Sequence, residues 1–330
     1  MPSTGILRRQ VLGISPAEVR FSRRGFRSGP GLARTRLEAV GGAFVAGYHA
    51  ALLDDRPLNL ERHLATVPAE LRGFAFEGAA MALVLIDSLT PWNRSRFTAF
   101  LAGPGAPHLY MAHVGAGWAL ARLRRGPRWL VERLHPVPSF IDRLHPLYRW
   151  LAVDGYGFHE GYFAPARHLD GQPHPRGLPG YAARAFDQGL GRALWFAEGA
   201  DAEAIGNAIS RFDAHRHNDL WSGVGLAAAY AGGVEEKVLE RLRALAGNHG
   251  AHLAQGAAFA AKARARAELP SPVTEIGCRI FCATSAAEAA AVTDRALAEL
   301  PVAAAEPGAE PAYETWRRQI HSHFASRGQA

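Results

Sequence analysis

Strongly apolar stretches rich in glycine and alanine alternate along the chain with shorter, more polar stretches. The polar stretches at 58–71, 202–215 and 235–246 place apolar residues three and four positions apart. That period is typical of an amphipathic helix with one buried face. The alternation therefore predicts two kinds of helix that follow one another along the chain.

Inside the apolar stretches, a glycine repeatedly precedes an alanine by four residues. The pairs recur about every 35 residues, at Gly47/Ala51, Gly78/Ala82, Gly115/Ala119, Gly189/Ala193, Gly223/Ala227 and Gly256/Ala260, with Gly157/Gly161 in the longest gap. Residues at i and i+4 lie on one face of a helix. Since a glycine inside a helix costs about 1 kcal/mol relative to alanine, its repetition indicates neighbouring helices that pack closely.

We expect an all-α fold of tandem helical hairpins that resemble a tetratricopeptide-like array, with one short strand near the C-terminus at 273–281. The alternative is an irregular helical protein in which codon bias enriches glycine and alanine. The expected parts are a basic N-terminal arm (1–36), a helical half (37–163), a Pro/Gly-rich loop (164–180), a second helical half (181–300) and a linker with a terminal helix (301–330).

The formal net charge of +7 is concentrated at the N-terminus. Residues 1–36 contain eight arginines and one acid, Glu18, so this arm carries 8 − 1 = +7, and the remaining 29 basic and 29 acidic residues cancel. A neutral body argues against a phosphate-binding surface across the whole molecule, and nucleic-acid binding would depend on the arm alone. Neither a secretory signal nor a membrane span is evident, and the two cysteines suggest no disulfide framework, so we expect a cytoplasmic protein.

Common catalytic signatures are missing from the sequence. It has no phosphate-binding glycine loop, no nucleophile elbow and no His-Glu-x-x-His helix, and its fifteen histidines lack the spacing of a metal site, so no metal is expected and any cofactor stays unknown. The run 154–162 is the richest in chemistry, because His159 and Glu160 are joined there by Asp154, Tyr156 and Tyr162. These residues suit proton transfer and ligand contact, or a tightly packed helix start capped by Asp154.

The residue just before the repeated glycine is polar in four units, at Glu77, Gln188, Ser222 and Gln255. Equivalent positions in stacked hairpins share a face, so these side chains could line one groove, together with His113 and Asp187. The alternative is that Glu77 and Asp187 form structural ion pairs with arginines such as Arg192, Arg72 or Arg184. The aromatic residues Trp195, Phe196 and Trp221 fit either the core or an apolar ligand lining.

Four blocks resemble the bacterial family known as domain of unknown function 1702. They are Phe74–Ala82, Asp154–Tyr162, Phe186–Trp195 and Asp219–Ala227, and the resemblance covers about residues 5–300. Relatives are encoded beside the iterative polyketide synthase of enediyne biosynthesis. The resemblance thus implies a role near this synthase, but it provides no catalytic residues.

That role suggests an accessory protein that binds an apolar polyene intermediate and helps to convert it. His159, Glu160 and Glu77 would then be catalytic, and the substrate-binding residues would be His113, Asp154, Tyr156, Tyr162, Asp187, Gln188, Trp195 and Trp221. The alternative is a non-catalytic α-repeat scaffold whose basic arm docks onto the synthase or another pathway protein.

Overall fold

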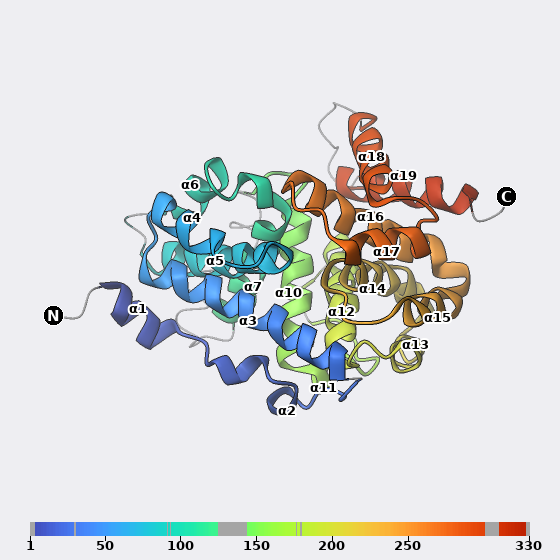
Figure 1. Cartoon of the computed structure of the whole chain (residues 1–330), viewed down its shortest axis with the longest axis horizontal. Coiled ribbons are helices and arrows are strands. Elements are labelled where there is room, and N and C mark those ends of the chain that lie inside the picture. Colours follow the sequence, from blue (N-terminus) through green and yellow to red (C-terminus); the bar gives the residue numbers. More distant parts are fainter. Residues whose placement is uncertain are drawn as a thin grey trace.

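The computed structural model describes residues 4–29, 31–90, 92, 94–124, 144–175, 177–178, 180–300 and 310–327, and these form helices and connecting segments with no strand among them (Figure 1). The prediction of an all-α fold is confirmed. Seven long helices form its framework: α3 (Gly31–Leu53), α5 (Ala69–Leu89), α7 (Leu109–Arg124), α10 (Arg149–Phe163), α12 (Tyr181–Ala197), α14 (His217–Ala231) and α16 (Gly250–Arg266).

The seven long helices pack in chain order, each against the next, and the repeated glycines lie where they cross. At the crossing of α10 and α12, a Cβ on Gly157 would overlap the carbonyl oxygen of Phe186, and one on Gly189 would overlap that of Asp154. Such reciprocal contacts join most neighbouring pairs along the row. The glycine pattern therefore reflects backbone-to-backbone packing, as predicted.

Shorter helices follow the long ones. They are α4 (Pro57–Ala65), α6 (Arg96–Ala102), α11 (Pro165–His168), α13 (Ala202–Ser210), α15 (Glu236–Ala246) and α17 (Pro272–Phe281). Three of them, α4, α13 and α15, lie within the polar amphipathic stretches predicted at 58–71, 202–215 and 235–246, apart from the first residue of α4. In α15 only Leu239, Leu242 and Ala246 are buried, at helical spacing on one face. A long helix followed by a short one agrees with hairpin units, and the tetratricopeptide-like form of the array stays a prediction.

The row of long helices bends until its end meets its beginning. Arg36 of α3 donates to the carbonyl oxygen of Ala231 at 3.0 Å, and Arg264 of α16 donates to that of Glu70 at 2.9 Å. The rings of Phe74 and Tyr230 pack edge to face, with centroids 5.1 Å apart. The long helices thus enclose an interior between α3 and α5 on one side and α12 and α14 on the other.

The predicted strand at 273–281 is wrong, because this segment forms α17. Pro272 occupies the first turn, where its missing N–H costs nothing, and Glu275 is favourable near a helix N-terminus. The buried residues Thr274, Gly277, Cys278 and Phe281 follow a three-to-four spacing that fits a helix and not the two-residue period of a strand.

Residues of the predicted arm are helical and pack on the body. They form α1 (Thr4–Leu12), a 3-10 turn η1 (Pro16–Val19) and α2 (Phe21–Arg24), and Phe21 is only 1% exposed. Elsewhere in the chain three more 3-10 turns each precede a long helix: η2 (Ala106–His108) before α7, η3 (Ala214–Arg216) before α14 and η4 (Gly247–His249) before α16.

At the C-terminus, α18 (Ala286–Ala298) is followed by α19 (Ala312–Arg327), the predicted terminal helix. Residues 301–309 of the predicted linker lie outside the described residues. The proposed division of the chain into parts stays a prediction.

Candidate functional site

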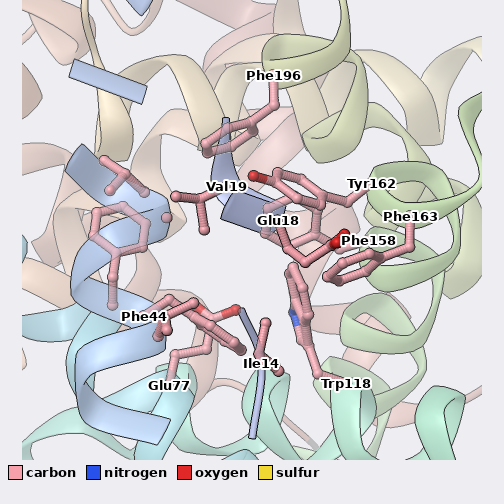
Figure 2. Close-up of a pocket in the computed structure, with 14 residues that line it drawn as sticks. Ile14, Glu18, Val19, Phe44, Glu77, Trp118, Phe158, Tyr162, Phe163 and Phe196 are labelled. Atoms are coloured by element: carbon pink, nitrogen blue, oxygen red, sulfur yellow. The ribbon is translucent and has the colours of Figure 1, made fainter. Parts of the chain in front are cut away.

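An apolar cavity lies inside the row of long helices, between α3, α5, α7, α10 and α12 (Figure 2). We call it the aromatic cavity, because half of its fourteen lining residues carry rings: Phe44, Phe74, Trp118, Phe158, Tyr162, Phe163 and Phe196. Phe158 and Tyr162 are one helical turn apart on α10, so both reach the same side. The cavity is therefore built by helix faces from both halves of the chain.

Glu77 is the acidic side chain that α5 places in this apolar wall (Figure 2). It is 1% exposed, and neither of its carboxylate oxygens makes a well-formed hydrogen bond with the described residues. The indole Nε1 of Trp118, across the cavity, also lacks such a partner. Buried polar groups without partners are rare in folded proteins, so a ligand or water that completes these two groups is expected.

Burial raises the pKa of Glu77 to about 8. The Arg192 guanidinium and the Trp118 indole oppose this rise, whereas the Asp154 carboxylate adds to it. At neutral pH the side chain is therefore mainly a carboxylic acid, which can donate one hydrogen bond and accept others. A pKa near neutrality also suits a group that gives and takes protons.

A buried ion pair lies next to Glu77. Arg192 Nη1 is 2.7 Å from Asp154 Oδ1, and both residues are at most 3% exposed. Burial raises the pKa of Asp154, and the bonded Arg192 guanidinium opposes that rise. As an ion pair the two side chains are neutral overall, and so is protonated Glu77, so these three side chains bring no net charge to the interior at neutral pH.

Arg192 also lines a second apolar cavity, on the other side of the ion pair, with Tyr110, Met111, Leu151 and Tyr230 in its wall. Helices α7 and α10 contribute their N-terminal halves to this cavity and their C-terminal halves to the aromatic cavity, and α12 contributes Arg192 to this cavity and Phe196 to the aromatic cavity. These three helices therefore run in the same direction, and the ion pair separates two apolar spaces.

A cover segment, Ile14–Val19, closes the aromatic cavity from outside, with Ile14, Glu18 and Val19 in the wall (Figure 2). Polar contacts of this region are few: the Ile14 N–H donates to His49 Nε2 at 3.2 Å, the Tyr48 hydroxyl donates to the carbonyl of Leu12 just before the segment at 2.7 Å, and Glu18 pairs with Arg23 and Arg24 of α2. The closed cavity has about 30 Å³, enough for about two water molecules. A larger ligand therefore requires the cover segment or the aromatic side chains to move.

His159 and Glu160 lie beside the aromatic cavity and not in its wall. Both are buried, and Glu160 bridges two histidines: Oε1 is 3.2 Å from His159 Nδ1 and Oε2 is 3.1 Å from His168 Nε2. The His159 ring packs against Trp118, with centroids 5.5 Å apart. The structure thus connects these two predicted residues with the cavity through Trp118, and it adds His168 at the end of α11, which sequence reasoning missed because the segment 164–180 was predicted to be a loop.

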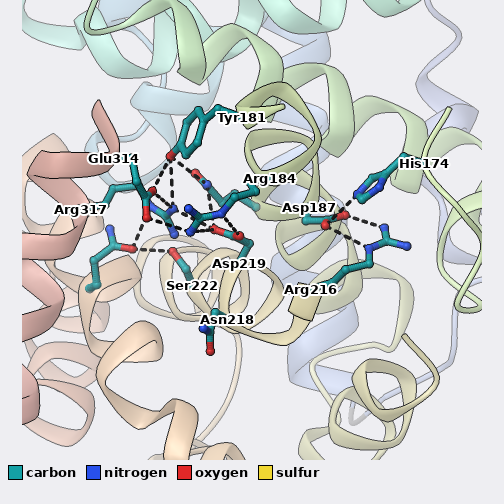
Figure 3. Close-up of polar contacts among 12 residues, drawn as sticks. His174, Tyr181, Arg184, Asp187, Arg216, Asn218, Asp219, Ser222, Glu314 and Arg317 are labelled. Atoms are coloured by element: carbon teal, nitrogen blue, oxygen red, sulfur yellow. Dashed lines mark hydrogen bonds and ion pairs between the residues drawn. The ribbon is translucent and has the colours of Figure 1, made fainter. Parts of the chain in front are cut away.

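Most polar residues that precede the repeated glycines lie in another place. Gln188, Ser222 and Gln255 belong to a buried network that α19 completes (Figure 3). Arg317 of α19 is its centre, with Nη1 at 2.8 Å from Asp219 Oδ1 and 2.7 Å from Glu314 Oε2. These contacts account for the polar side chains as links between helices. Sequence reasoning missed Arg317, because nothing near it in the chain marks its distant partners.

Asp187 forms a separate ion pair. Its Oδ1 is 2.5 Å from Arg216 Nη2, and its Oδ2 accepts a second bond from Arg216 and lies 2.8 Å from His174 Nε2 (Figure 3). The alternative of a structural ion pair fits this geometry, with a different arginine from the three expected. The network and this pair both lie apart from the wall of the aromatic cavity.

The remaining predicted ligand contacts divide between cavity and core. Tyr162 is in the wall of the aromatic cavity. Trp195 is fully buried and donates to the Gly232 carbonyl at 3.1 Å, and Trp221 and Tyr156 are buried as well. Burial lowers the pKa of His113 to about 4. The aromatic cavity therefore brings together two predicted residues, Glu77 and Tyr162, with Asp154 directly behind them.

Comparisons with known proteins identify one family. A family model described as a protein of unknown function (DUF1702) matches residues 3–324, nearly the whole chain. No curated protein and no solved structure matches. Within the described residues, none of the helices has the length and apolar character needed to cross a membrane.

Proposed function

We propose that this chain, which belongs to the DUF1702 family of proteins of unknown function, binds a neutral, apolar, conjugated small molecule in the aromatic cavity and acts on it through Glu77. The observation that carries the proposal is a buried carboxyl group in a wall of aromatic rings, with neither oxygen in a well-formed hydrogen bond to the described residues. A structural acid would be expected to have a partner, whereas a ligand-binding acid is completed by its ligand.

The charge balance of the interior supports a neutral ligand. Asp154 and Arg192 cancel, and Glu77 is mainly protonated at pH 7. A ligand anion would add an uncompensated charge to a buried apolar site, which is strongly unfavourable. A hydrocarbon with a carbonyl or ester group would instead accept a hydrogen bond from the Glu77 carboxyl or the Trp118 indole.

The resemblance to proteins encoded beside an enediyne polyketide synthase suggests which conjugated molecule this is. We infer that the ligand is the apolar polyene product of an iterative polyketide synthase, and that the chain is an accessory protein of that pathway. Aromatic rings suit such a ligand, since flat conjugated chains pack well against ring faces and edges.

The chemistry open to Glu77 is a shift of double bonds. The carboxyl group protonates one end of a conjugated segment, and the resulting carboxylate removes a proton from another carbon, so that the ligand is isomerised and Glu77 is restored. Atoms and electrons balance without a redox partner. In this proposal His159 and Glu160 position Trp118, which would stabilise the positive charge on the ligand through its ring face.

Two adjacent glycines of α3 provide a matched test of the site. Gly41 lines the aromatic cavity, where a side chain would contact Val19 and Tyr162, whereas nothing lies within 4 Å of a Cβ on Gly42. The probe is the methyl ester of a linear conjugated tetraene acid, followed by its fluorescence. We expect saturable binding to wild type and Gly42→Leu, and none to Gly41→Leu. Equal binding by both variants would place the ligand elsewhere.

A second experiment separates binding from chemistry. Glu77→Gln retains the shape and hydrogen-bonding capacity of the carboxylic acid but cannot transfer a proton, so the ester should bind while any change in its absorption spectrum with time disappears. Glu61→Gln, an exposed position, should behave as wild type. The free tetraene acid should bind more weakly than the ester. A preference for the free acid would contradict the charge argument.

A further inference from the structure

The exposed large apolar side chains of the described residues gather at one end of the molecule. They are Ile6, Leu7 and Val11 in α1, Leu53 at the end of α3, Leu58 in α4, Leu89 at the end of α5, and Trp92. Trp92 is 82% exposed and Val11 is 71% exposed. Leu32, at the start of α3, is the other member of this group and lies outside the cluster. We call the clustered residues the α1 patch.

Polar contacts join the elements that carry the α1 patch. Asp55, after α3, binds Arg8 of α1 at 3.0 Å and Arg96 of α6 at 2.5 Å. Arg96 also binds Asp87 of α5 at 3.1 Å. Gly5 packs so closely on the carbonyl of Leu53 that a Cβ would overlap it. Helices α1, α4 and α6 accordingly lie at the same end of the molecule in Figure 1, so the patch is one surface.

The charge of this surface is positive. Around the patch, these elements carry six arginines, Arg8, Arg9, Arg56, Arg62, Arg94 and Arg96, against four acids, Asp54, Asp55, Glu61 and Asp87, which gives a net charge of 6 − 4 = +2. Asp54, Asp55 and Asp87 are bonded by Arg56, Arg8 and Arg96, which leaves Arg9, Arg62 and Arg94 against the exposed Glu61. Exposed aliphatic side chains, a tryptophan and arginines on one surface are the composition of proteins that lie on a membrane without crossing it.

We infer that the α1 patch binds the surface of an anionic lipid bilayer. Leu7 and Val11 are one helical turn apart, so they can enter the apolar boundary together while Arg62 and Arg94 of the neighbouring elements meet lipid phosphates. A monomeric protein seldom exposes a continuous apolar area of this kind without a partner. The inference stands on exposure and charge and is independent of the proposed function.

The patch also has a connection to the aromatic cavity, and this step rests on the proposed function. Gly13 alone separates α1 from the cover segment Ile14–Val19. A bilayer that holds α1 would therefore hold the cover of the cavity close to the medium in which an apolar polyene dissolves. The protein could then take its ligand from lipid without exposing it to water.

Sedimentation with vesicles tests the inference on the full chain. Wild type should sediment with vesicles of phosphatidylcholine and phosphatidylglycerol in equal parts, and much less with phosphatidylcholine alone or in high salt. The double substitution Leu7→Glu with Val11→Glu, and separately Trp92→Ser, should each lower the partition coefficient by about tenfold. Leu32→Glu is the matched control at an equally exposed site and should partition as wild type.

The inference would be wrong if wild type did not bind anionic vesicles, or if Leu32→Glu lost as much binding as the patch variants. It would also be wrong if wild type formed dimers at higher concentration and only the patch variants stayed monomeric, because the surface would then bind a second copy of the chain. Circular dichroism of each variant should match wild type, because the substituted residues are exposed. Binding of the tetraene ester in the absence of lipid is the independent measurement: its loss would contradict the proposed function and leave the vesicle result unaffected.

Discussion

The protonated state of Glu77 can be measured as a pH-dependent stability. Its pKa is about 8 in the folded chain and 4.5 as an ordinary glutamate. Between these pH values the unfolded chain releases a proton that the folded chain keeps. Rising pH therefore favours unfolding, by about 1.4 kcal/mol per pH unit. The contribution of Glu77 to stability is fully present below about pH 4.5, is reduced by about 3 kcal/mol at pH 7, and changes no further above about pH 8.

Urea unfolding of wild type and Glu77→Gln at several pH values from 5 to 9 provides the assay. Glutamine has nearly the same shape as glutamic acid and does not titrate. Between pH 5 and pH 8 the free energy of unfolding of wild type should therefore fall by about 3 kcal/mol more than that of Glu77→Gln. Glu61→Gln controls for the loss of an exposed carboxylate and should follow wild type. If Glu77→Gln and wild type change in parallel with pH, Glu77 is ionised in the fold, and the argument for a neutral interior fails.

Three further predictions follow from the packing. Gly223→Ala places a Cβ against the carbonyl of Gln188 and should lower the free energy of unfolding, measured with urea, by about 2 kcal/mol. Gly42→Ala lies in open space on α3 and should raise the free energy of unfolding by up to about 1 kcal/mol in the same assay. Asp187→Asn should destabilise the fold by about 3 kcal/mol in the same assay, because it leaves the buried guanidinium of Arg216 uncompensated. Both cysteines are buried, so a thiol reagent should label them only with urea present; rapid labelling of the native chain would contradict the packing of α17.

The close packing of the long helices could be predicted from the sequence because its cause is local. Where two helix backbones touch, a Cβ cannot fit, so the crossing leaves a glycine in each partner, as at Gly157 and Gly189. The residue before that glycine is polar in four units, but its partner depends on what packs against each helix. Gln188 donates to Asp219 and Ser222 donates to Gln255, and Arg317 of α19, 62 residues beyond Gln255, joins these two pairs, so no local pattern predicts the network.

Glu77 shows the complementary case. The equivalent position on α5 is not reached by the network of Arg317, so its carboxyl is left in an apolar wall made by Trp118, Phe158 and Tyr162. The sequence indicated that Glu77 was polar inside an apolar helix, but a structural ion pair and a ligand contact were equally consistent with that pattern. The absence of a partner for its oxygens among the described residues favours the ligand contact, and only the assembled helices show it.

The distribution of charge along the chain requires a different interpretation from the one that the sequence suggests. Counted by segment, the body is neutral and the first 36 residues carry +7, which describes a free basic arm. In the structure three of these arginines form ion pairs with acids of the body: Arg8 with Asp55, Arg27 with Glu198 and Arg36 with Glu70. These pairs help to hold the N-terminal helices in place. Surface ion pairs of this kind stabilise a protein only weakly. A segment held by weak pairs and a few hydrogen bonds suits a cover that must open, and among the eight arginines of residues 1–36 only Arg9 forms no ion pair with the described residues.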